Sequence, residues 1–165
     1  MRRLRAGEWA AACGAALLLV ALFLEWFSLL AIEFGDTGVV ARDVESGWSG
    51  LGWLTLVFAV AAIAVGAWMA FAVVTGRPVA QMVAASVLTA TVGTLAFIAI
   101  ALRVLIFQPG PNDITELRYG AWLGLLAALI LAVGGWLAIK DERTDAPESA
   151  YTPPEPRPPP PARAA

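Results

Sequence analysis

Four long apolar stretches dominate this chain and limit what it can fold into. They cover residues 9–32, 51–74, 81–107 and 121–139 of a 165-residue sequence. A helix that crosses the hydrocarbon core of a bilayer needs about 20 consecutive apolar residues. Only 15% of the residues are charged, whereas about a quarter are charged in a soluble globular domain. The sequence therefore predicts an all-α membrane protein, with a four-transmembrane-helix antiparallel bundle over residues 1–143.

The chain changes character after residue 143. Segment 144–165 is rich in proline and charge and ends in "PEPRPPPPARAA", so it has almost nothing to bury. We expect a disordered, proline-rich cytoplasmic tail with polyproline II character. Such a tail is either a ligand for an aromatic groove on a partner or an inert solvated segment.

The first apolar stretch has two interpretations, because Arg2, Arg3 and Arg5 precede it. Basic residues before an apolar run are typical of a signal peptide, which is removed from the mature chain. This run is longer than the usual apolar core of a signal peptide, and no clear small-x-small cleavage site follows it. We therefore expect an uncleaved first helix.

Basic residues near the helix ends predict the orientation, since Lys and Arg accumulate on the cytoplasmic side. If the amino terminus is cytoplasmic, that side holds Arg2, Arg3, Arg5, Arg77, Lys140 and Arg143. The outer side then holds only Arg42 and Arg118. Ten of the eleven basic residues are arginine and alanine is abundant, which suggests a GC-rich bacterial genome. We expect a multi-pass protein of the bacterial inner membrane with both termini in the cytoplasm.

The connections carry turn and strand signals. "TGRPVA" between the second and third stretches predicts a tight turn, so these helices should be antiparallel neighbours. In the first outer loop, "GVVARDVE" predicts a short strand or hairpin. In the second outer loop, Pro109 and Pro111 should end the third helix, and "NDITEL" is a candidate for one turn of interfacial helix.

Two sets of residues predict how the helices meet lipid and each other. Tryptophans near helix ends are typical of anchors at the headgroup level: Trp9, Trp26, Trp48, Trp53, Trp122 and Trp136. Small residues at helical spacing let helix backbones approach closely in lipid. The glycines of these stripes are Gly14, Gly66, Gly120, Gly124 and Gly135.

Glu25 is a carboxylate inside the first apolar stretch, in "LFLEWFSLL". On one continuous helix it would share a face with Gly14 and Ser28, and so would point into the bundle. Arg103 ends the equivalent face of the third stretch at a similar depth. We therefore predict an intramembrane ion pair between Glu25 and Arg103. The alternatives are Arg118 as the partner of Glu25, or two side chains that reach the outer headgroups independently.

The composition excludes several kinds of chemistry. The chain has no histidine and a single cysteine, Cys13, so it has neither a histidine-based metal or acid–base site nor a disulfide within the chain. We read Cys13 as an apolar filler rather than a lipidated or redox thiol. Asp36, Asp43 and Glu45 are spread along one loop, which is more typical of solvated acids than of a metal site. We expect no catalytic residues, no cofactor and no metal, and the net charge of −2 gives no nucleic-acid footprint.

The segments "LFLEWFS", "GWSGLGWL" and "GAWLGLLAALILAVGGWLAIKDE" resemble small, uncharacterised four-helix integral membrane proteins of GC-rich bacteria. The resemblance covers most of residues 9–143 and brings no activity with it. The four-span layout with a larger first outer loop is also similar to claudin-like proteins, although the paired loop cysteines of that family are absent here.

Together these features predict a non-catalytic membrane protein that is a structural or accessory subunit. Its partners would be the lipid bilayer and either further copies of itself or a larger membrane-protein complex. The alternative function is a transporter or channel component that uses the Glu25–Arg103 pair as an intramembrane site.

Overall fold

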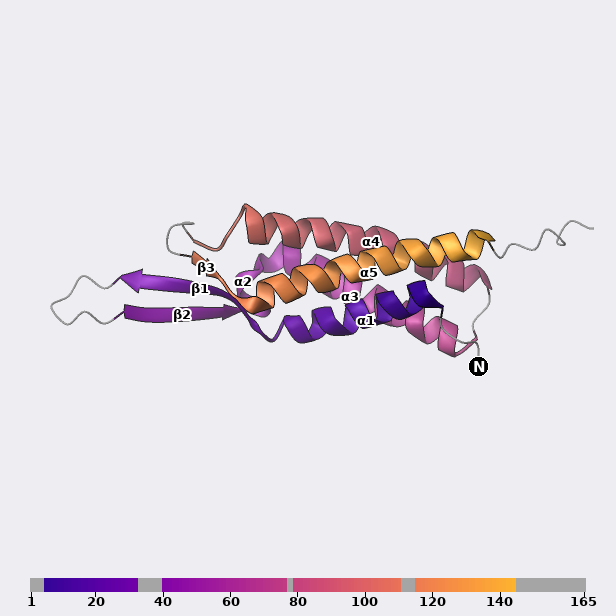
Figure 1. The fold of residues 1–165 in the computed structure, drawn as a ribbon, viewed down its shortest axis with the longest axis horizontal. Coiled ribbons are helices and arrows are strands. Elements are labelled where there is room, and N and C mark those ends of the chain that lie inside the picture. Colours follow the sequence, from indigo (N-terminus) through magenta and orange to yellow (C-terminus); the bar gives the residue numbers. More distant parts are fainter. Residues whose placement is uncertain (1–4, 33–39, 77–78, 111–114, 145–165) are drawn as a thin grey trace, which may run out of the picture.

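Four long helices and a three-stranded sheet make up the part of the chain that the computed structural model describes, residues 5–32, 40–76, 79–110 and 115–144. The helices, including the short α2, are α1 (Ala6–Ala21), α2 (Gly47–Gly50), α3 (Gly52–Val74), α4 (Val79–Leu105) and α5 (Tyr119–Thr144). The strands are β1 (Glu25–Ile32), β2 (Val40–Ser46) and β3 (Thr115–Leu117). The sheet lies at one end of the helices (Figure 1).

The four long helices pack in a closed ring. α1 packs against α5, α5 against α4, α4 against α3, and α3 against α1. Three of them contain segments long and apolar enough to cross a membrane: Gly52–Val74, Gln81–Leu105 and Tyr119–Lys140. The second, third and fourth predicted spans therefore fall on helices that are long and apolar enough to cross a membrane, and α3 and α4 are neighbours as the short connection predicted.

The first predicted span, residues 9–32, is not one helix. α1 ends at Ala21 after 16 residues, and β1 begins at Glu25. The prediction of a continuous helix was wrong, because a strand buried on both faces gives the same unbroken apolar pattern as a buried helix. β1 is such a strand near its start, where the consecutive residues Trp26, Phe27 and Ser28 are all fully buried.

The sheet is antiparallel and has the order β2-β1-β3. β1 pairs with β2 from Glu25–Ser46 to Ile32–Val40, with an irregularity at Trp26, and with β3 at Phe27–Leu117. The strand predicted in "GVVARDVE" is confirmed by β2. The helical turn predicted in "NDITEL" was wrong for Thr115–Leu117, because these residues complete the edge of β1 as a strand; the rest of that segment lies outside the described residues.

The interior of the bundle is built mainly from small side chains, and large apolar side chains point outward. The buried positions include Ala11, Ala15, Ala59, Ala62, Ala85, Ala90 and Ala96. Trp53 is 78% exposed and Phe23 is 68% exposed. A cluster of larger buried residues lies beneath the sheet and includes Leu22, Trp26, Phe27 and Ile100. This inversion is typical of helices that pack in lipid, where close backbone approach replaces the hydrophobic effect.

α5 continues to Thr144, beyond the predicted end at residue 139. The predicted disordered tail otherwise falls on residues 145–165, which lie outside the described part of the chain.

Candidate functional site

Glu25 lies at the junction between the sheet and the helices. α1 and α5 run antiparallel, and Gly14 lies against the backbone of Leu131. Farther along, Gly120, near the start of α5, lies against the backbone carbonyl of Glu25. The Glu25 side chain is exposed. Glu25 therefore stands level with the first turn of α5, at the end of the bundle and not on an inward helix face.

Trp26 explains why the first helix stops where it does. Its indole N–H donates a hydrogen bond of 2.6 Å to the carbonyl of Ala21, the last residue of α1. In a continuing helix the N–H of Glu25 would occupy that carbonyl. The benzo ring of Trp26 fills the space that Gly124 leaves on α5, and its Nε1 lies 2.8 Å from where a Cβ on Gly47 would be. The prediction of an interfacial anchor was wrong for Trp26, because its side chain is fully buried.

Arg103, near the end of α4, is held by backbone carbonyls. Its Nε donates to the carbonyl of Gly50 at 3.0 Å, and its Nη1 donates to the carbonyl of Phe107 at 2.6 Å. Carbonyls at a helix C-terminus carry a partial negative charge that favours a cation. The guanidinium thus caps the C-terminal end of α4 and links it to α2 by a hydrogen bond.

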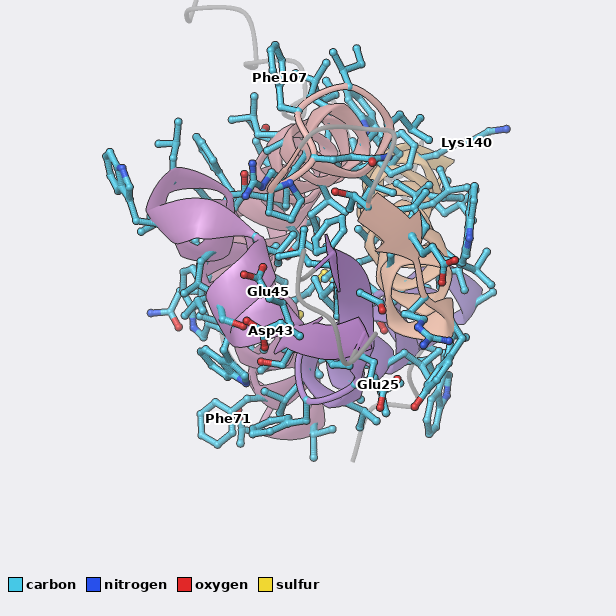
Figure 2. All side chains as sticks on the ribbon, turned by 90° about the vertical axis from the view of Figure 1, so that its left-hand side faces the viewer. Glu25, Asp43, Glu45, Phe71, Phe107 and Lys140 are labelled. Carbon is cyan, nitrogen blue, oxygen red and sulfur yellow. The ribbon has the colours of Figure 1, made fainter. Side chains whose placement is uncertain are left out.

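Glu25 and Arg103 do not form the predicted pair in the described part of the chain, where Arg103 donates to backbone carbonyls and Glu25 has no side-chain partner. Viewed from the sheet end, Glu25 lies on the opposite side of the bundle from Phe107, whose carbonyl Arg103 binds (Figure 2). The reason is the helix-to-strand change after Ala21. It removes Glu25 from the helical face that the prediction assumed.

Three buried polar atoms at the junction make no hydrogen bond within the described part of the chain: Ser28 Oγ, Glu45 Oε2 and Arg118 Nε. Ser28 is fully buried in the middle strand, opposite Val44 on one side and Glu116 on the other. The backbone N–H of Arg118 donates to the carbonyl of Trp26 at 2.9 Å, so Arg118 stands at the base of the sheet. Buried polar groups usually have partners, so this junction has unused hydrogen-bonding capacity.

The predicted packing glycines all lie where two elements touch. Gly14 meets Leu131, Gly66 meets Ala15, Gly120 meets Glu25, Gly124 meets Trp26, and Gly135 meets Ala90. At Gly14 a Cβ would lie 2.5 Å from the backbone nitrogen of Leu131, and at Gly135 it would lie 2.6 Å from that of Ala90. These glycines let α1 and α4 approach α5 at backbone distance. Sequence reasoning did not single out Gly7 and Gly134, which make similar contacts between α1 and α5.

The other predicted anchors are at least two-fifths exposed: Trp9, Trp48, Trp53, Trp122 and Trp136. The indole N–H of Trp136 has a specific partner, since it donates at 3.1 Å to the hydroxyl oxygen of Thr94 on α4. That hydroxyl itself donates to the carbonyl of Ala90. Trp136 therefore joins α5 to α4 by a polar contact that needs no water.

The remaining hydroxyls inside the bundle are structural. Thr89, Thr91 and Thr94 each donate to the carbonyl four residues earlier, so these hydroxyls bond back to their own helix. Thr89 also approaches the carbonyl of Val65 at 3.3 Å, which links α4 to α3. Among the described residues, no group of three or more His, Cys, Asp or Glu side chains could hold a metal ion.

Sequence reasoning missed that the two predicted outer loops are joined in one sheet, because β1 pairs with β2 from one loop and with β3 from the other. The available signal was the short segment "ITEL" with its alternating pattern, but three residues are too few to distinguish a strand from a turn. The fold defines a class, a mostly helical protein with three helices that can cross a membrane. The sequence matches no protein-family model and no curated protein.

Proposed function

We propose that this chain is a non-catalytic integral membrane protein of the bacterial inner membrane. It crosses the bilayer four times and serves as a structural or accessory subunit, associating with itself or with a larger membrane complex. Its outward sheet is the contact surface. One observation carries the proposal: both outer loops contribute strands to a single sheet that projects beyond the helices (Figure 1).

The length of α1 supports four crossings, although α1 alone is too short. Its 16 residues rise about 24 Å. The turn that follows brings Glu25 to Gly120, so residues 6–25 run beside almost the whole apolar part of α5. Three turn residues thus complete the crossing, and the backbone around them packs on protein rather than lipid, because Leu22 lies against Gly47 and Glu25 lies against Gly120.

Exposed aromatic residues support two membrane boundaries. Phe23, Trp48, Trp53, Phe107 and Trp122 are exposed around the sheet end of the bundle, and Phe23 and Trp48 stack edge to face with ring centroids 5.5 Å apart. Trp9, Trp68, Phe71 and Trp136 are exposed toward the other end. On α3, Trp53 and Phe71 are separated by about 27 Å of helix, close to the thickness of a hydrocarbon core of about 30 Å.

The distribution of basic residues supports the orientation. The end of the bundle without the sheet holds Arg5 and Lys140, and Arg77 lies in the connection between α3 and α4. The positive-inside rule therefore supports a cytoplasmic position for this end and an outer position for the sheet.

The edge of the sheet supports a role in association. In the described part of the chain β2 pairs only with β1, so one side of its backbone is free to pair with another strand. Asp43, which is exposed on β2, places charge on this edge, which limits unselective pairing and favours a complementary partner.

A photo-crosslinking residue placed at Val44 tests this function. Val44 is 41% exposed on β2, and Val60 is 43% exposed on α3 and provides the matched control. We expect one discrete crosslinked product from Val44, and products from Val60 that vary between preparations. A chain that is monomeric in membranes, gives no crosslink at Val44 and supports substrate-dependent flux in liposomes would instead be a transporter.

A further inference from the structure

An apolar groove between α1 and α5 is closed at both ends by backbone contacts. At its inner end Gly14 lies against Leu131, and at its outer end Gly120 lies against Glu25. Between these two contacts the helices separate and leave about 320 Å³ of space, part of it open to the surroundings.

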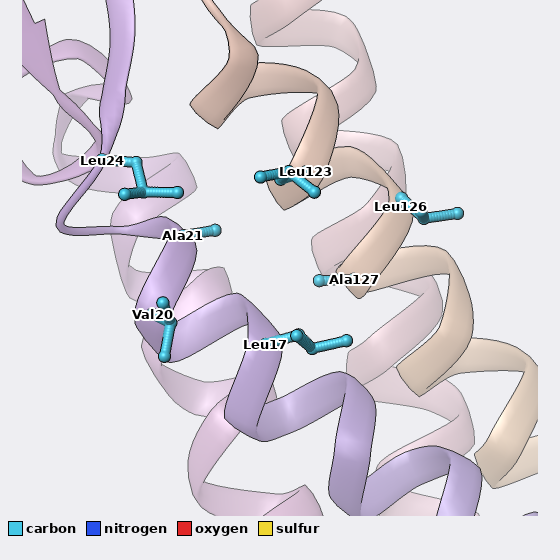
Figure 3. Close-up of a pocket in the computed structure, with 7 residues that line it drawn as sticks. All are labelled: Leu17, Val20, Ala21, Leu24, Leu123, Leu126 and Ala127. Carbon is cyan, nitrogen blue, oxygen red and sulfur yellow. The ribbon is translucent and has the colours of Figure 1, made fainter.

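Only apolar side chains line this groove. Leu17, Val20 and Leu24 come from α1 and the turn after it, and Leu123, Leu126 and Ala127 come from α5 (Figure 3). Leu17 and Val20 are at least half exposed, as is Leu126, so the groove opens sideways. It extends over about 10 Å along α1, from Leu17 to the level of Leu24.

The length and place of the groove favour an acyl chain as its occupant. Two packed helices have their axes 8–10 Å apart and share contacts over several turns, whereas both ends of this groove are blocked after about two turns. In the proposed orientation the groove lies in the outermost part of the hydrocarbon core, directly below Glu25. That is where the first carbons of a lipid chain lie.

Charged residues of both signs are anchored near the outer end of the groove. Glu25 follows the lining residue Leu24, is exposed, and has no side-chain partner in the described part of the chain. Arg118 binds the carbonyl of Trp26 through its backbone, and its Nε has no hydrogen-bond partner there. A guanidinium favours phosphate oxygens, and a carboxylate favours an ammonium that can donate hydrogen bonds.

We propose that this groove binds one phospholipid whose headgroup carries a phosphate and a primary ammonium. One acyl chain fills the groove, the ammonium binds Glu25, and the phosphate binds Arg118. The inference rests on the proposed membrane insertion and adds a selective lipid site to it.

Native mass spectrometry of the detergent-purified full chain tests the site. The protein is incubated with an equimolar mixture of dioleoyl phosphatidylethanolamine, phosphatidylcholine and phosphatidylglycerol. We expect the ethanolamine lipid to be retained about threefold over each of the others, the size expected of one exposed charge pair. Glu25→Gln should remove the preference for the ethanolamine lipid over the glycerol lipid, and Arg118→Gln should lower the retention of all three.

A matched pair of variants tests the groove itself. Leu17→Trp fills it, whereas Leu19→Trp introduces the same side chain on the same helix at a position with similar exposure outside the groove. We expect only Leu17→Trp to lose bound lipid. Equal retention of the three lipids, or equal loss in the two tryptophan variants, overturns the site. Fractionation with membranes after an alkaline wash separates the two proposals. A chain that stays with the membrane yet shows no lipid preference loses only the lipid site, and a chain that is washed off loses both.

Discussion

Replacing Trp26 by phenylalanine tests the idea that one buried indole ends the first helix and seats the sheet. The change removes the N–H that donates to Ala21 and the part of the indole that lies against Gly124. Phenylalanine is apolar and aromatic, so the substitution keeps much of the buried surface. Its cost therefore reports on the hydrogen bond and on the space left behind.

The expected cost follows from two contributions. The carbonyl of Ala21 also accepts the N–H of Leu24 at 3.0 Å, so it keeps one partner when the indole is lost. The loss is then the net value of one hydrogen bond, about 1 kcal/mol, and not the larger penalty of a buried group without a partner. A void of roughly 40 Å³ adds about 1 kcal/mol, at about 24 cal/mol per Å³. The free energy of unfolding should fall by about 2 kcal/mol.

A substitution at Gly124 tests the same contact from the other helix, and its effect should depend on which residue stands at position 26. A Cβ at residue 124 would overlap the benzo ring of Trp26, so Gly124→Ala alone should cost about 1–3 kcal/mol through overpacking. In the Trp26→Phe background that ring is gone, and the added methyl group enters the void. The double variant should therefore be more stable than the sum of the two single effects predicts.

Equilibrium unfolding in detergent micelles measures the free energy of unfolding of the wild type, the two single variants and the double variant. Trp53→Phe is the control, because Trp53 is 78% exposed. The control should change stability by less than about 0.5 kcal/mol. If Trp26→Phe costs no more than Trp53→Phe, or if the two changes at Trp26 and Gly124 are additive, the proposed role of the indole is refuted.

Three further tests address the contacts of the bundle. Gly135→Ala should destabilise the protein by about 1–3 kcal/mol because the methyl group meets the backbone of α4, and an unchanged unfolding midpoint would contradict this contact. Thr94→Val and Trp136→Phe should show a coupling of about 0.6 kcal/mol in a double-mutant cycle, a typical value for interhelical hydrogen bonds in membranes; strict additivity would mean that the bond is not formed. Arg103→Gln should lower the free energy of unfolding by about 2 kcal/mol, because two carbonyls lose a charged donor. In the same measurement the stability of Arg103→Lys should fall between those of the wild type and Arg103→Gln.

The sequence predicts most of the helical part of this fold for simple reasons. α3, α4 and α5 are unbroken apolar runs with turn residues between them, so their length alone identifies them. β2 lies in a loop where its alternating pattern is visible between glycines. The stripe glycines also lie where close approach requires them, because helix periodicity holds within α1, α3 and α5.

The junction is less predictable because its contacts are distant in sequence. The hydrogen bond from Trp26 to Ala21 joins residues that are close in sequence. The space for the indole ring, however, is left by Gly124, which is distant in sequence. Once the helix ends at Ala21, every residue after it changes face, and the predicted partner of Glu25 changes with it. The carbonyl contacts of Arg103 could have been predicted from the sequence, because a basic residue in the last turn of a helix often binds the free carbonyls there.

The central claim is that the first apolar run leaves the membrane at Glu25. Labelling with a membrane-impermeant maleimide tests this directly, with Glu25→Cys and Leu18→Cys each placed in a Cys13→Ser background and expressed in cells with an accessible outer face of the inner membrane. Leu18 is fully buried in the same run and is the control. We predict that the cysteine at position 25 is labelled from outside without detergent, while the one at position 18 is not. If position 25 is as protected as position 18 until the protein is denatured, the run crosses as one helix and the account is contradicted.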